Sequence, residues 1–276
     1  MLNILFVGLG LIGGSMVKRL LDVSGYNVGG ADINARVMTD AITKGYIKTD
    51  VIEQNADVIV MCLYPAASIE WLKNNMDKLP KGVLVTDCLG VKRQMYDFCA
   101  KNGIKYVGMH PMAGRECKGY ENSLADLFVG ANFILVEGEY DAEADERAKN
   151  VDIVCKLAND LGAGNIIKAS CAKHDKMIGY TSQLEHVIAS CVVHSKFFDE
   201  HKAYEGNSFE DFTRISRGIN PIMWSELFCE NKQALCKVLD EHIQILGDMR
   251  DMIFNEDVEG IYLQLEECNE KWRALK

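Results

Sequence analysis

Short apolar runs separated by turn residues recur through the first 169 residues of the chain. Some of these runs, such as Val-Ile-Val-Met at residues 58–61, are apolar without alternation, which is typical of strands covered on both faces. We predict strands at residues 2–7, 27–31, 56–63, 82–87, 105–109, 132–136 and 165–168. Segments of helical periodicity separate several of them, notably residues 11–23 and 142–161. This alternation predicts an α/β fold with a doubly wound parallel sheet.

Chain-breaking residues are distributed unevenly: 18 of 23 glycines and three of four prolines lie in residues 1–169. The remaining segments are long and contain few breakers. Within residues 233–253 the apolar positions recur at helical spacing, namely Leu235, Leu239, Leu246, Met249 and Ile253. We therefore predict an α/β domain of residues 1–169 followed by an all-helical domain of residues 170–276. The apolar stripe favours a homodimer formed through the helical domain, although it could also pack within its own domain.

The 276-residue chain is 48% hydrophobic and 25% charged, which is ordinary for a globular protein with a full core. Its net charge of −10 argues against a nucleic-acid partner, because phosphate binding requires clustered Lys and Arg. No apolar run reaches the roughly 18 residues of a membrane span, and no signal-peptide pattern precedes the first strand. The ten cysteines show neither zinc-ligand nor disulfide spacing. We therefore predict a cytoplasmic protein without a metal site.

A glycine-rich motif, Gly-Leu-Gly-Leu-Ile-Gly at residues 8–13, follows the first predicted strand and opens the first predicted helix. In a dinucleotide-binding turn the first glycine permits the tight turn and the second lets the backbone approach a pyrophosphate. The third allows close packing of helix and strand, and the helix N-terminus attracts anions. The motif predicts a Rossmann-type domain in which the cofactor is held by Gly8, Gly10, Leu11, Ile12 and Gly13.

Asp32 ends the second predicted strand, 19 residues beyond the last glycine of the motif. A carboxylate there accepts hydrogen bonds from both hydroxyls of the adenosine ribose and repels a 2′-phosphate, so we predict NAD. Arg36 lies nearby and leaves NADP open, and a glycine turn that binds nothing is the structural alternative. Leu63, Tyr64 and Pro65 end the third predicted strand, and we expect them to line the nicotinamide side of the site.

His110 follows the fifth predicted strand, within the segment Gly-Met-His-Pro-Met-Ala-Gly-Arg-Glu at residues 108–116. The carboxyl ends of parallel strands face the ligand in this fold, so the imidazole is expected at the site. Position alone favours a catalytic histidine and a structural one equally.

Further motifs accompany these along the chain. In order they are the glycine motif with Asp32, Thr86-Asp87 with Val91-Lys92, His110-Pro111-Met112-Ala113-Gly114 with Gly119 and Leu127-Phe128, His174-Asp175, His186, and Asp211-Phe212-Thr213-Arg214-Ile215 with Asn220-Pro221 and Trp224. In these motifs the chain resembles the prephenate/arogenate dehydrogenases of tyrosine biosynthesis, over residues 1 to about 255. The His-Pro-Met-Ala-Gly and Asp-Phe-Thr-Arg blocks are specific to that family, whereas the glycine motif is not.

The resemblance implies an oxidoreductase that passes hydride from the ring carbinol of a cyclohexadienyl acid to NAD, while the ring carboxylate leaves as carbon dioxide. With prephenate the products are 4-hydroxyphenylpyruvate, carbon dioxide and NADH. The resemblance makes His110 the base that takes the hydroxyl proton, a task suited to neutral imidazole near pH 7. Arg214 matches the family arginine that binds a substrate carboxylate. His186 matches a histidine near the substrate, and Gln183 shares its helical face.

An acidic protein that holds a dicarboxylate has to concentrate positive charge locally, and we expect Arg214 to supply it. A charge-assisted hydrogen bond is worth roughly 1.5–3 kcal/mol, more than weak screened repulsion from distant carboxylates. Lys92 and Arg115 could add positive potential from exposed positions. We expect His174 and Asp175 to order the junction between the domains.

Three positions depart from the family pattern: Gly90, Gln183 and Glu185. Gly90 stands where the family has a serine that supports the catalytic histidine and the substrate hydroxyl, and we expect Gly90 to border the substrate. A water molecule or Cys88 would then have to replace the missing hydroxyl. Residues 182–186 read Ser-Gln-Leu-Glu-His where the family has Ser-His-Leu-Pro-His. These three changes leave the substrate preference and the rate open.

Three alternatives remain at this point. Arogenate dehydrogenase differs only in the amine of the substrate side chain. Reductases of the 6-phosphogluconate or pyrroline-carboxylate type also pair a dinucleotide domain with a helical one, but they do not predict the block around His110. A non-catalytic dinucleotide sensor is favoured by Gly90 alone. We expect neither a fused chorismate mutase before the first strand nor a fused regulatory domain after the helical part.

Overall fold

The computed structural model describes residues 1–115 and 117–275. Strands in these residues form one sheet in the order β2-β1-β3-β4-β5-β6-β7. The strands are β1 (Leu2–Val7), β2 (Tyr26–Ala31), β3 (Val58–Met61), β4 (Leu84–Asp87), β5 (Lys105–Pro111), β6 (Asn132–Glu137) and β7 (Asn165–Lys168). All of them lie where apolar runs predict strands, and β1 and β7 keep the predicted bounds.

The last two strands run against the others. Strands β1 to β5 are mutually parallel, β6 pairs with β5 in the antiparallel sense, and β7 is parallel to β6. A parallel partner requires a crossover connection, usually a helix. Between β5 and β6 the described residues contain only the 3₁₀ turn η2 (Tyr120–Asn122), so the chain returns in the opposite direction. The doubly wound α/β fold is confirmed, but the expectation of parallel strands throughout fails at β6 and β7.

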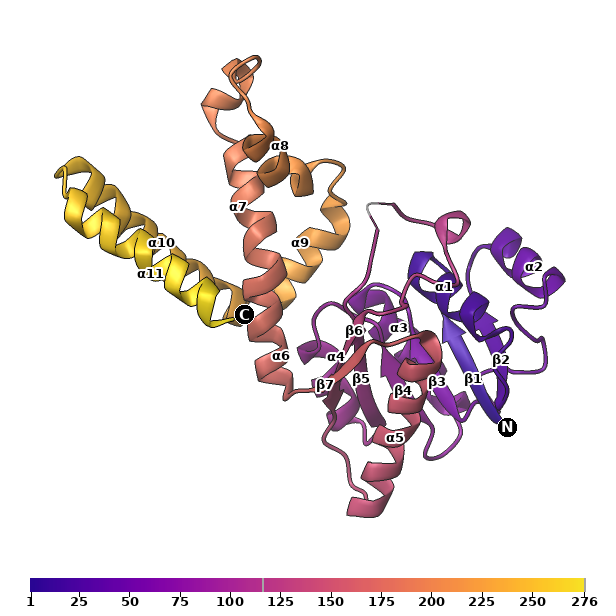
Figure 1. Cartoon of the computed structure of the whole chain (residues 1–276). Coiled ribbons are helices and arrows are strands. Elements are labelled where there is room, and N and C mark those ends of the chain that lie inside the picture. Colours follow the sequence, from indigo (N-terminus) through magenta and orange to yellow (C-terminus); the bar gives the residue numbers. More distant parts are fainter. Residues whose placement is uncertain (116, 276) are drawn as a thin grey trace.

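Helices cover both faces of the sheet (Figure 1). They are α1 (Leu11–Leu20), α2 (Ala35–Thr43), α3 (Pro65–Asn75), α4 (Arg93–Lys101) and α5 (Ala144–Leu161), with a short 3₁₀ turn η1 (Met76–Lys78) after α3. In β1, Ile4 and Phe6 enter one core while Leu5 and Val7 enter the other. This two-sided burial explains why the strand sequences show no polar alternation.

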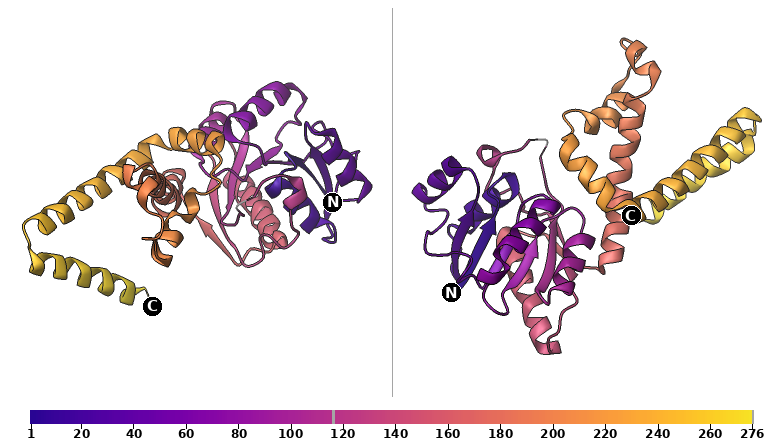
Figure 2. Two further views of the ribbon diagram at one scale, coloured as in Figure 1. Left: turned by 90° about the horizontal axis from the view of Figure 1, so that it is seen from above. Right: turned by 180° about the vertical axis from the view of Figure 1, so that it is seen from behind.

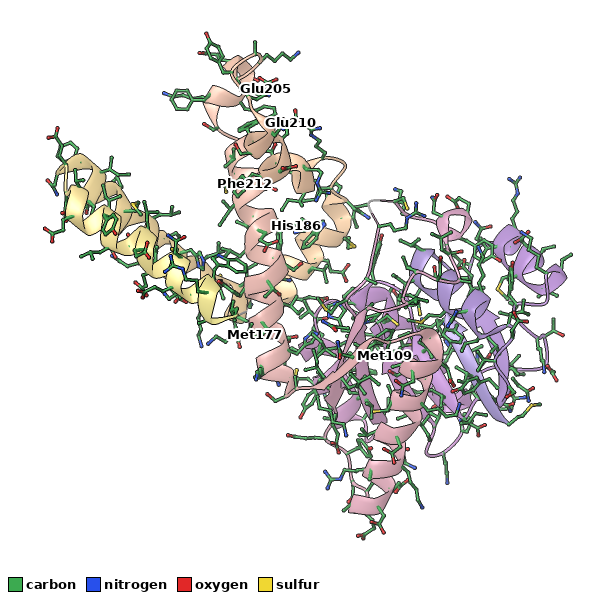
Figure 3. The ribbon with its side chains drawn as sticks, in the orientation of Figure 1. Met109, Met177, His186, Glu205, Glu210 and Phe212 are labelled. Carbon is green, nitrogen blue, oxygen red and sulfur yellow. The ribbon has the colours of Figure 1, made fainter. Side chains whose placement is uncertain are left out.

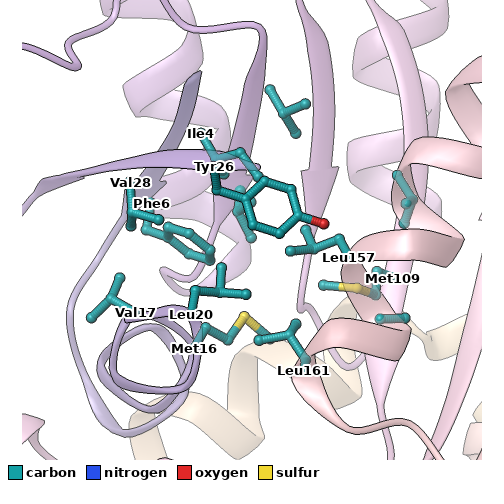
Figure 4. Packing of buried hydrophobic residues seen from close by; sticks show 14 of the residues in the cluster. Ile4, Phe6, Met16, Val17, Leu20, Tyr26, Val28, Met109, Leu157 and Leu161 are labelled. Atoms are coloured by element: carbon teal, nitrogen blue, oxygen red, sulfur yellow. The ribbon is translucent and has the colours of Figure 1, made fainter. Parts of the chain in front are cut away.

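The core on one face holds the glycine-rich turn and its helix in place. Met16 of α1 packs there with Phe6 of β1 and with Leu157 and Leu161 of α5 (Figure 4). All four side chains are less than 2% exposed. The start of α1 is therefore fixed against the carboxyl ends of the strands.

After β7 the chain is helical and leaves the sheet (Figure 1). The elements are α6 (Cys171–Ile178), the π-helical turn η3 (Gly179–Gln183), α7 (Leu184–Val193), η4 (Lys196–Glu200), α8 (Asn207–Thr213), η5 (Arg214–Ser216), α9 (Pro221–Glu230), α10 (Lys232–Phe254) and α11 (Val258–Ala274). The predicted helix at residues 233–253 is confirmed as α10. Within the described residues, no helix combines the length and the apolarity needed to cross a bilayer.

The last two helices, α10 and α11, project away from the α/β domain (Figure 2). Large apolar side chains on this pair are exposed, among them Ile243, Leu246, Ile253, Phe254, Tyr262, Leu263 and Trp272. So many exposed large apolar side chains on one helix pair are typical of a protein–protein interface.

Candidate active site

The glycine-rich turn has the geometry of a dinucleotide cradle. Gly8 adopts a φ of +93°, and a Cβ there would lie 2.9 Å from the Cys62 carbonyl oxygen. A Cβ at Gly13 would lie 2.0 Å from the Gly8 carbonyl oxygen, so α1 packs directly on the turn. Beside Gly10, in contrast, a Cβ would meet nothing within 4 Å. The backbone therefore leaves open space in front of the first amides of α1, at Leu11 and Ile12, which have no intrahelical acceptor.

Asp32 lies at the end of β2, next to this turn. Its carboxylate accepts hydrogen bonds from the backbone amides of Leu9, at 2.7 Å, and Asn34, at 2.8 Å. These bonds fix the carboxylate between the glycine turn and the start of α2, where an adenosine ribose is bound in this fold. The cradle and the carboxylate together fit NAD.

The segment after β3 joins the two domains. Leu63 packs on the glycine turn, because a Cβ at Gly8 would lie 2.7 Å from its Cδ2. Pro65 begins α3, and the hydroxyl of Tyr64 accepts a hydrogen bond from Asn220 Nδ2 at 2.9 Å. Two residues on, the amide of Ala66 donates to Glu226 Oε1 at 2.6 Å. Glu226 lies on α9 and Asn220 caps that helix, so these two bonds hold α9 over the carboxyl edge of the strands.

His110 lies in β5 at the same edge and retains partly exposed surface. Its Nδ1 lies 2.9 Å from His174 Nε2, and His174 Nδ1 lies 2.7 Å from Asp175 Oδ1. The Asp175 carboxylate also accepts the backbone amides of Lys92, at 2.9 Å, and Arg93, at 3.1 Å. This chain of contacts runs between the domains and ends on the predicted base. The sequence pattern placed His174 and Asp175 only at the domain junction and gave no sign of their link to His110.

Burial sets the protonation state of both imidazoles. It lowers the pKa of His110 well below the ordinary value, and the nearby charge of Lys92 lowers it further. Burial likewise lowers the pKa of His174, although its hydrogen bond to Asp175 opposes the shift. Both rings are therefore neutral at pH 7, the state that a general base requires.

Lys92 is fully buried, and the expectation of an exposed position is wrong. Its ammonium pairs with Asp87 and donates to the Met109 carbonyl at 3.1 Å. Tyr106 donates to the other Asp87 oxygen at 2.8 Å. A buried charge has to be paired and hydrogen-bonded. In meeting that requirement, Lys92 fixes the end of β5 immediately before His110.

Gly90 lies where β4 leads into α4. A Cβ at this position would meet Leu227 of α9 at 3.7 Å, an ordinary contact, so a serine would fit here. Cys88 does not supply the missing hydroxyl, because its Sγ faces Met16 Sδ at 3.7 Å and Cys62 Sγ at 3.9 Å.

The helical domain supplies His186 on α7 (Figure 3). The ring stacks on Trp224, with centroids 3.8 Å apart. His186 Nδ1 lies 3.0 Å from the Ser182 carbonyl oxygen. Because a carbonyl only accepts, His186 Nδ1 carries the hydrogen of this bond. Arg214 begins η5, which packs against α7, and its side chain is exposed.

Gln183 lies behind the site rather than in it. The side chain is 1% exposed, donates to the Leu227 carbonyl at 3.2 Å and accepts from Asn231 at 2.5 Å. Asn231 also donates to the Asp175 carbonyl at 2.9 Å. A substrate contact would require Gln183 to give up these bonds. Its predicted role is therefore corrected to support of the α6–α7 segment.

The π-helical turn η3 lies between α6 and α7 and sets the angle between the side chains of His174 and His186 around the helix axis. At about 100° per residue, the twelve residues from His174 to His186 would place the two side chains roughly 120° apart on a regular α-helix. A π-turn accommodates one extra residue and reduces this angle to roughly 20°. The turn therefore brings both histidines to nearly the same side of the rod.

Comparisons with known proteins agree with this geometry. Residues 18–167 match a family model described as the nucleotide-binding domain of prephenate dehydrogenase, and residues 170–267 match its dimerization domain. A prephenate dehydrogenase of Bacillus subtilis is 28% identical over 94% of this chain and 72% of its own length. A cyclohexadienyl dehydrogenase of Zymomonas mobilis is 28% identical over 99% of this chain and 96% of its own length.

One solved structure adds a bound cofactor to the comparison. It is the crystal structure of prephenate dehydrogenase from A. aeolicus in complex with hydroxyphenyl propionate and NAD+. It superposes with a TM-score of 0.85 and 28% identity, covering 100% of this chain and 99% of the other.

Proposed function

The chain belongs to the prephenate dehydrogenase family, and from that premise we propose that it converts prephenate to 4-hydroxyphenylpyruvate in tyrosine biosynthesis, with NAD as oxidant. The observation that carries the proposal is the state of His110. It is a neutral, partly exposed imidazole at the same sheet edge as the glycine-rich turn. A base so placed can take the proton of a ring hydroxyl as the carbinol is oxidised.

NAD, when bound, accepts the hydride of the carbinol carbon. Gly10 leaves room for its pyrophosphate, while Gly8 and Gly13 allow the tight turn and the close packing of α1. Asp32 would accept hydrogen bonds from the ribose hydroxyls. Asp32 would face a 2′-phosphate with like charge, which favours NAD over NADP. Leu63 and Tyr64 border the nicotinamide side.

His110 takes the hydroxyl proton at Nε2 as the carbinol is oxidised, and returns it to the phenolate oxygen once the ring is aromatic. The ring carboxylate leaves as carbon dioxide, the electron pair of its C–C bond enters the ring, and aromatisation makes the step favourable. Arg214 and His186 hold the carboxylates of the substrate from the helical domain. Gly90 borders the ring without offering a hydroxyl. Positive charge is thus concentrated at the site of an acidic protein, where charge-assisted contacts are strongest.

A cyclohexadienyl acid with an amine in its side chain, arogenate, is the second candidate substrate. The likeness to the cyclohexadienyl dehydrogenase of Zymomonas mobilis supports this broader class. The two candidates differ only at the side chain, so the reaction and the role of His110 are the same for both.

Membership of this family also bears on the oligomeric state and the cellular compartment of the protein, and we propose both. The dimerization-domain match and the exposed apolar surface of α10 and α11 support a homodimer formed through residues 170–276, with residues 1–169 as the NAD-binding domain. All ten cysteines are free thiols, which supports a reducing, cytoplasmic compartment.

An NADH-formation assay with purified protein tests the proposal. Prephenate and arogenate are each offered with NAD and with NADP. We expect turnover of prephenate with NAD. Turnover of neither acid, with intact NAD binding, would favour a non-catalytic dinucleotide sensor.

A further inference from the structure

We propose that His174 and Asp175 are positioning residues that hold His110 in the one tautomer able to accept a proton at Nε2. The inference deepens the proposed function and rests on His110 being its base. It assigns to two residues of α6, in the helical domain, control over a base in the α/β domain.

The hydrogen-bond directions follow from the chemistry of the outermost group. Both Asp175 oxygens are approached by N–H groups: Oδ1 by Lys92 N and His174 Nδ1, and Oδ2 by Arg93 N. The carboxylate therefore acts as an acceptor, and His174 Nδ1 carries its hydrogen. In the neutral ring His174 Nε2 then has the lone pair.

The tautomer of His174 in turn sets the tautomer of His110. His110 Nδ1 lies 2.9 Å from that lone pair and must supply the hydrogen between them. A neutral His110 therefore has its own lone pair on Nε2, the nitrogen away from His174. In the opposite tautomer two lone pairs would face each other at this distance, and the base would present an N–H to the substrate hydroxyl.

Packing keeps this arrangement rigid. His174 is 1% exposed and Asp175 is 5% exposed. The backbone carbonyl of Asp175 accepts from Asn231, while its carboxylate accepts the amides of Lys92 and Arg93, where the β4–α4 connection enters α4. The imidazole of His174 is therefore held in place, and its contact with His110 Nδ1 orients the imidazole of His110 before substrate binds.

The arrangement also stabilises the product of proton transfer. When His110 gains a proton at Nε2 it becomes a cation near the buried Lys92, which is unfavourable. Its Nδ1–H then donates to a neutral acceptor that is itself backed by a carboxylate, which spreads the new charge toward Asp175. Gly90 provides no hydroxyl that could do the same.

Two substitutions at His174 distinguish the effect of its hydrogen-bond acceptor from the effect of its ring volume. In His174→Gln the amide oxygen can occupy the place of Nε2 and accept from His110, whereas His174→Phe keeps the ring volume without an acceptor. We expect His174→Phe to lower kcat by roughly 10²–10³, and His174→Gln to stay within about tenfold of wild type. The KM for prephenate and the Kd for NAD should change by less than about threefold in both.

Asp175→Asn tests the tautomer itself. An amide N–H directed at His174 Nδ1 would move its hydrogen to Nε2, reverse the contact with His110 and block the base. We expect kcat to fall by roughly 10²–10⁴, as expected when a base is held in the wrong tautomer. ¹⁵N chemical shifts of labelled histidine, in the full-length NAD-bound protein, should show hydrogen on Nδ1 of His110 in wild type and on Nε2 in Asp175→Asn.

The matched control is His194→Gln, which removes an imidazole outside the site. The melting temperature and the NAD Kd of each variant establish that it is folded. Wild-type kcat in folded His174→Phe, or hydrogen on Nε2 of His110 in wild type, would overturn the proposal. The ¹⁵N chemical shifts of the wild-type protein report the tautomer of His110 even if a variant fails to fold. They report it equally if prephenate is not turned over, a result that would refute the proposed function alone.

Discussion

The Nδ1 atom of His110 lies 2.9 Å from the Nε2 atom of His174, and this contact joins the α/β domain to the helical domain at the predicted catalytic base. The base and its support thus come from different domains. Any change in how the domains meet should alter the chemistry before it alters cofactor binding.

The first prediction concerns the base. His110→Asn removes the proton acceptor but leaves the glycine-rich turn and Asp32 untouched. We expect kcat to fall by roughly 10²–10⁴ while the Kd for NAD, measured by calorimetry, stays within about twofold. Normal turnover in this variant would remove His110 from the mechanism.

The second prediction concerns substrate charge. Arg214→Ala should raise the KM for prephenate roughly 10- to 100-fold, the loss expected for one charge-assisted contact. Arg217→Ala is the matched control, because Arg217 is also exposed and pairs with Glu210 at 3.0 Å on the surface. Steady-state kinetics should leave the control unchanged, and equal KM values in all three proteins would make Arg214 structural.

The third prediction separates two glycines of one motif. A Cβ at Gly13 would clash with the Gly8 carbonyl at 2.0 Å, whereas a Cβ at Gly10 meets nothing within 4 Å. Gly13→Ala should therefore lower the melting temperature. Gly10→Ala should keep it but weaken NAD binding at least about tenfold, because the methyl group enters the pyrophosphate space. Unchanged NAD affinity in Gly10→Ala would mean that the cofactor lies elsewhere.

The fourth prediction concerns pH and stability. Burial, together with the nearby carboxylates of Glu226 and Asp175, raises the pKa of Glu230 to about 7. A carboxyl whose pKa is raised on folding destabilises the fold progressively from about pH 4.3, the unfolded value, up to about pH 7, and by a constant amount above that. Glu230→Gln should therefore raise the melting temperature more at about pH 8.5 than at about pH 5.5. An equal change in melting temperature at both pH values would show that folding does not raise the pKa of Glu230.

Much of the fold was predictable because its signals are local. The unalternating run of β3 reports burial on both faces, and Gly8 and Gly13 report close backbone contacts that a side chain would prevent. A strand end and the following proline defined the place of His110, while its role as the base was implied by the family resemblance. The direction of β6 was not predictable from an apolar run, since it depends on the connection from β5 to β6, whose described residues contain no crossing helix.

The support of the site was harder to predict because it is formed by contacts distant in sequence. Lys92 looks like a surface lysine until β4 and β5 bring Asp87 and the Met109 carbonyl to its ammonium. Gln183 lies three residues before His186, but its contacts with the Leu227 carbonyl and Asn231, which keep it behind the site, come from segments distant in sequence. The adjacent pair His174-Asp175 was visible, but its partner lies in the other domain.

The most direct test of the central claim is to measure NADH and carbon dioxide together during turnover of prephenate. We expect one carbon dioxide to be released for each NADH formed in the wild-type protein, and both products to be lost together in His110→Asn. Prephenate left intact by a folded, NAD-binding wild-type protein, or NADH formed without carbon dioxide, would contradict it.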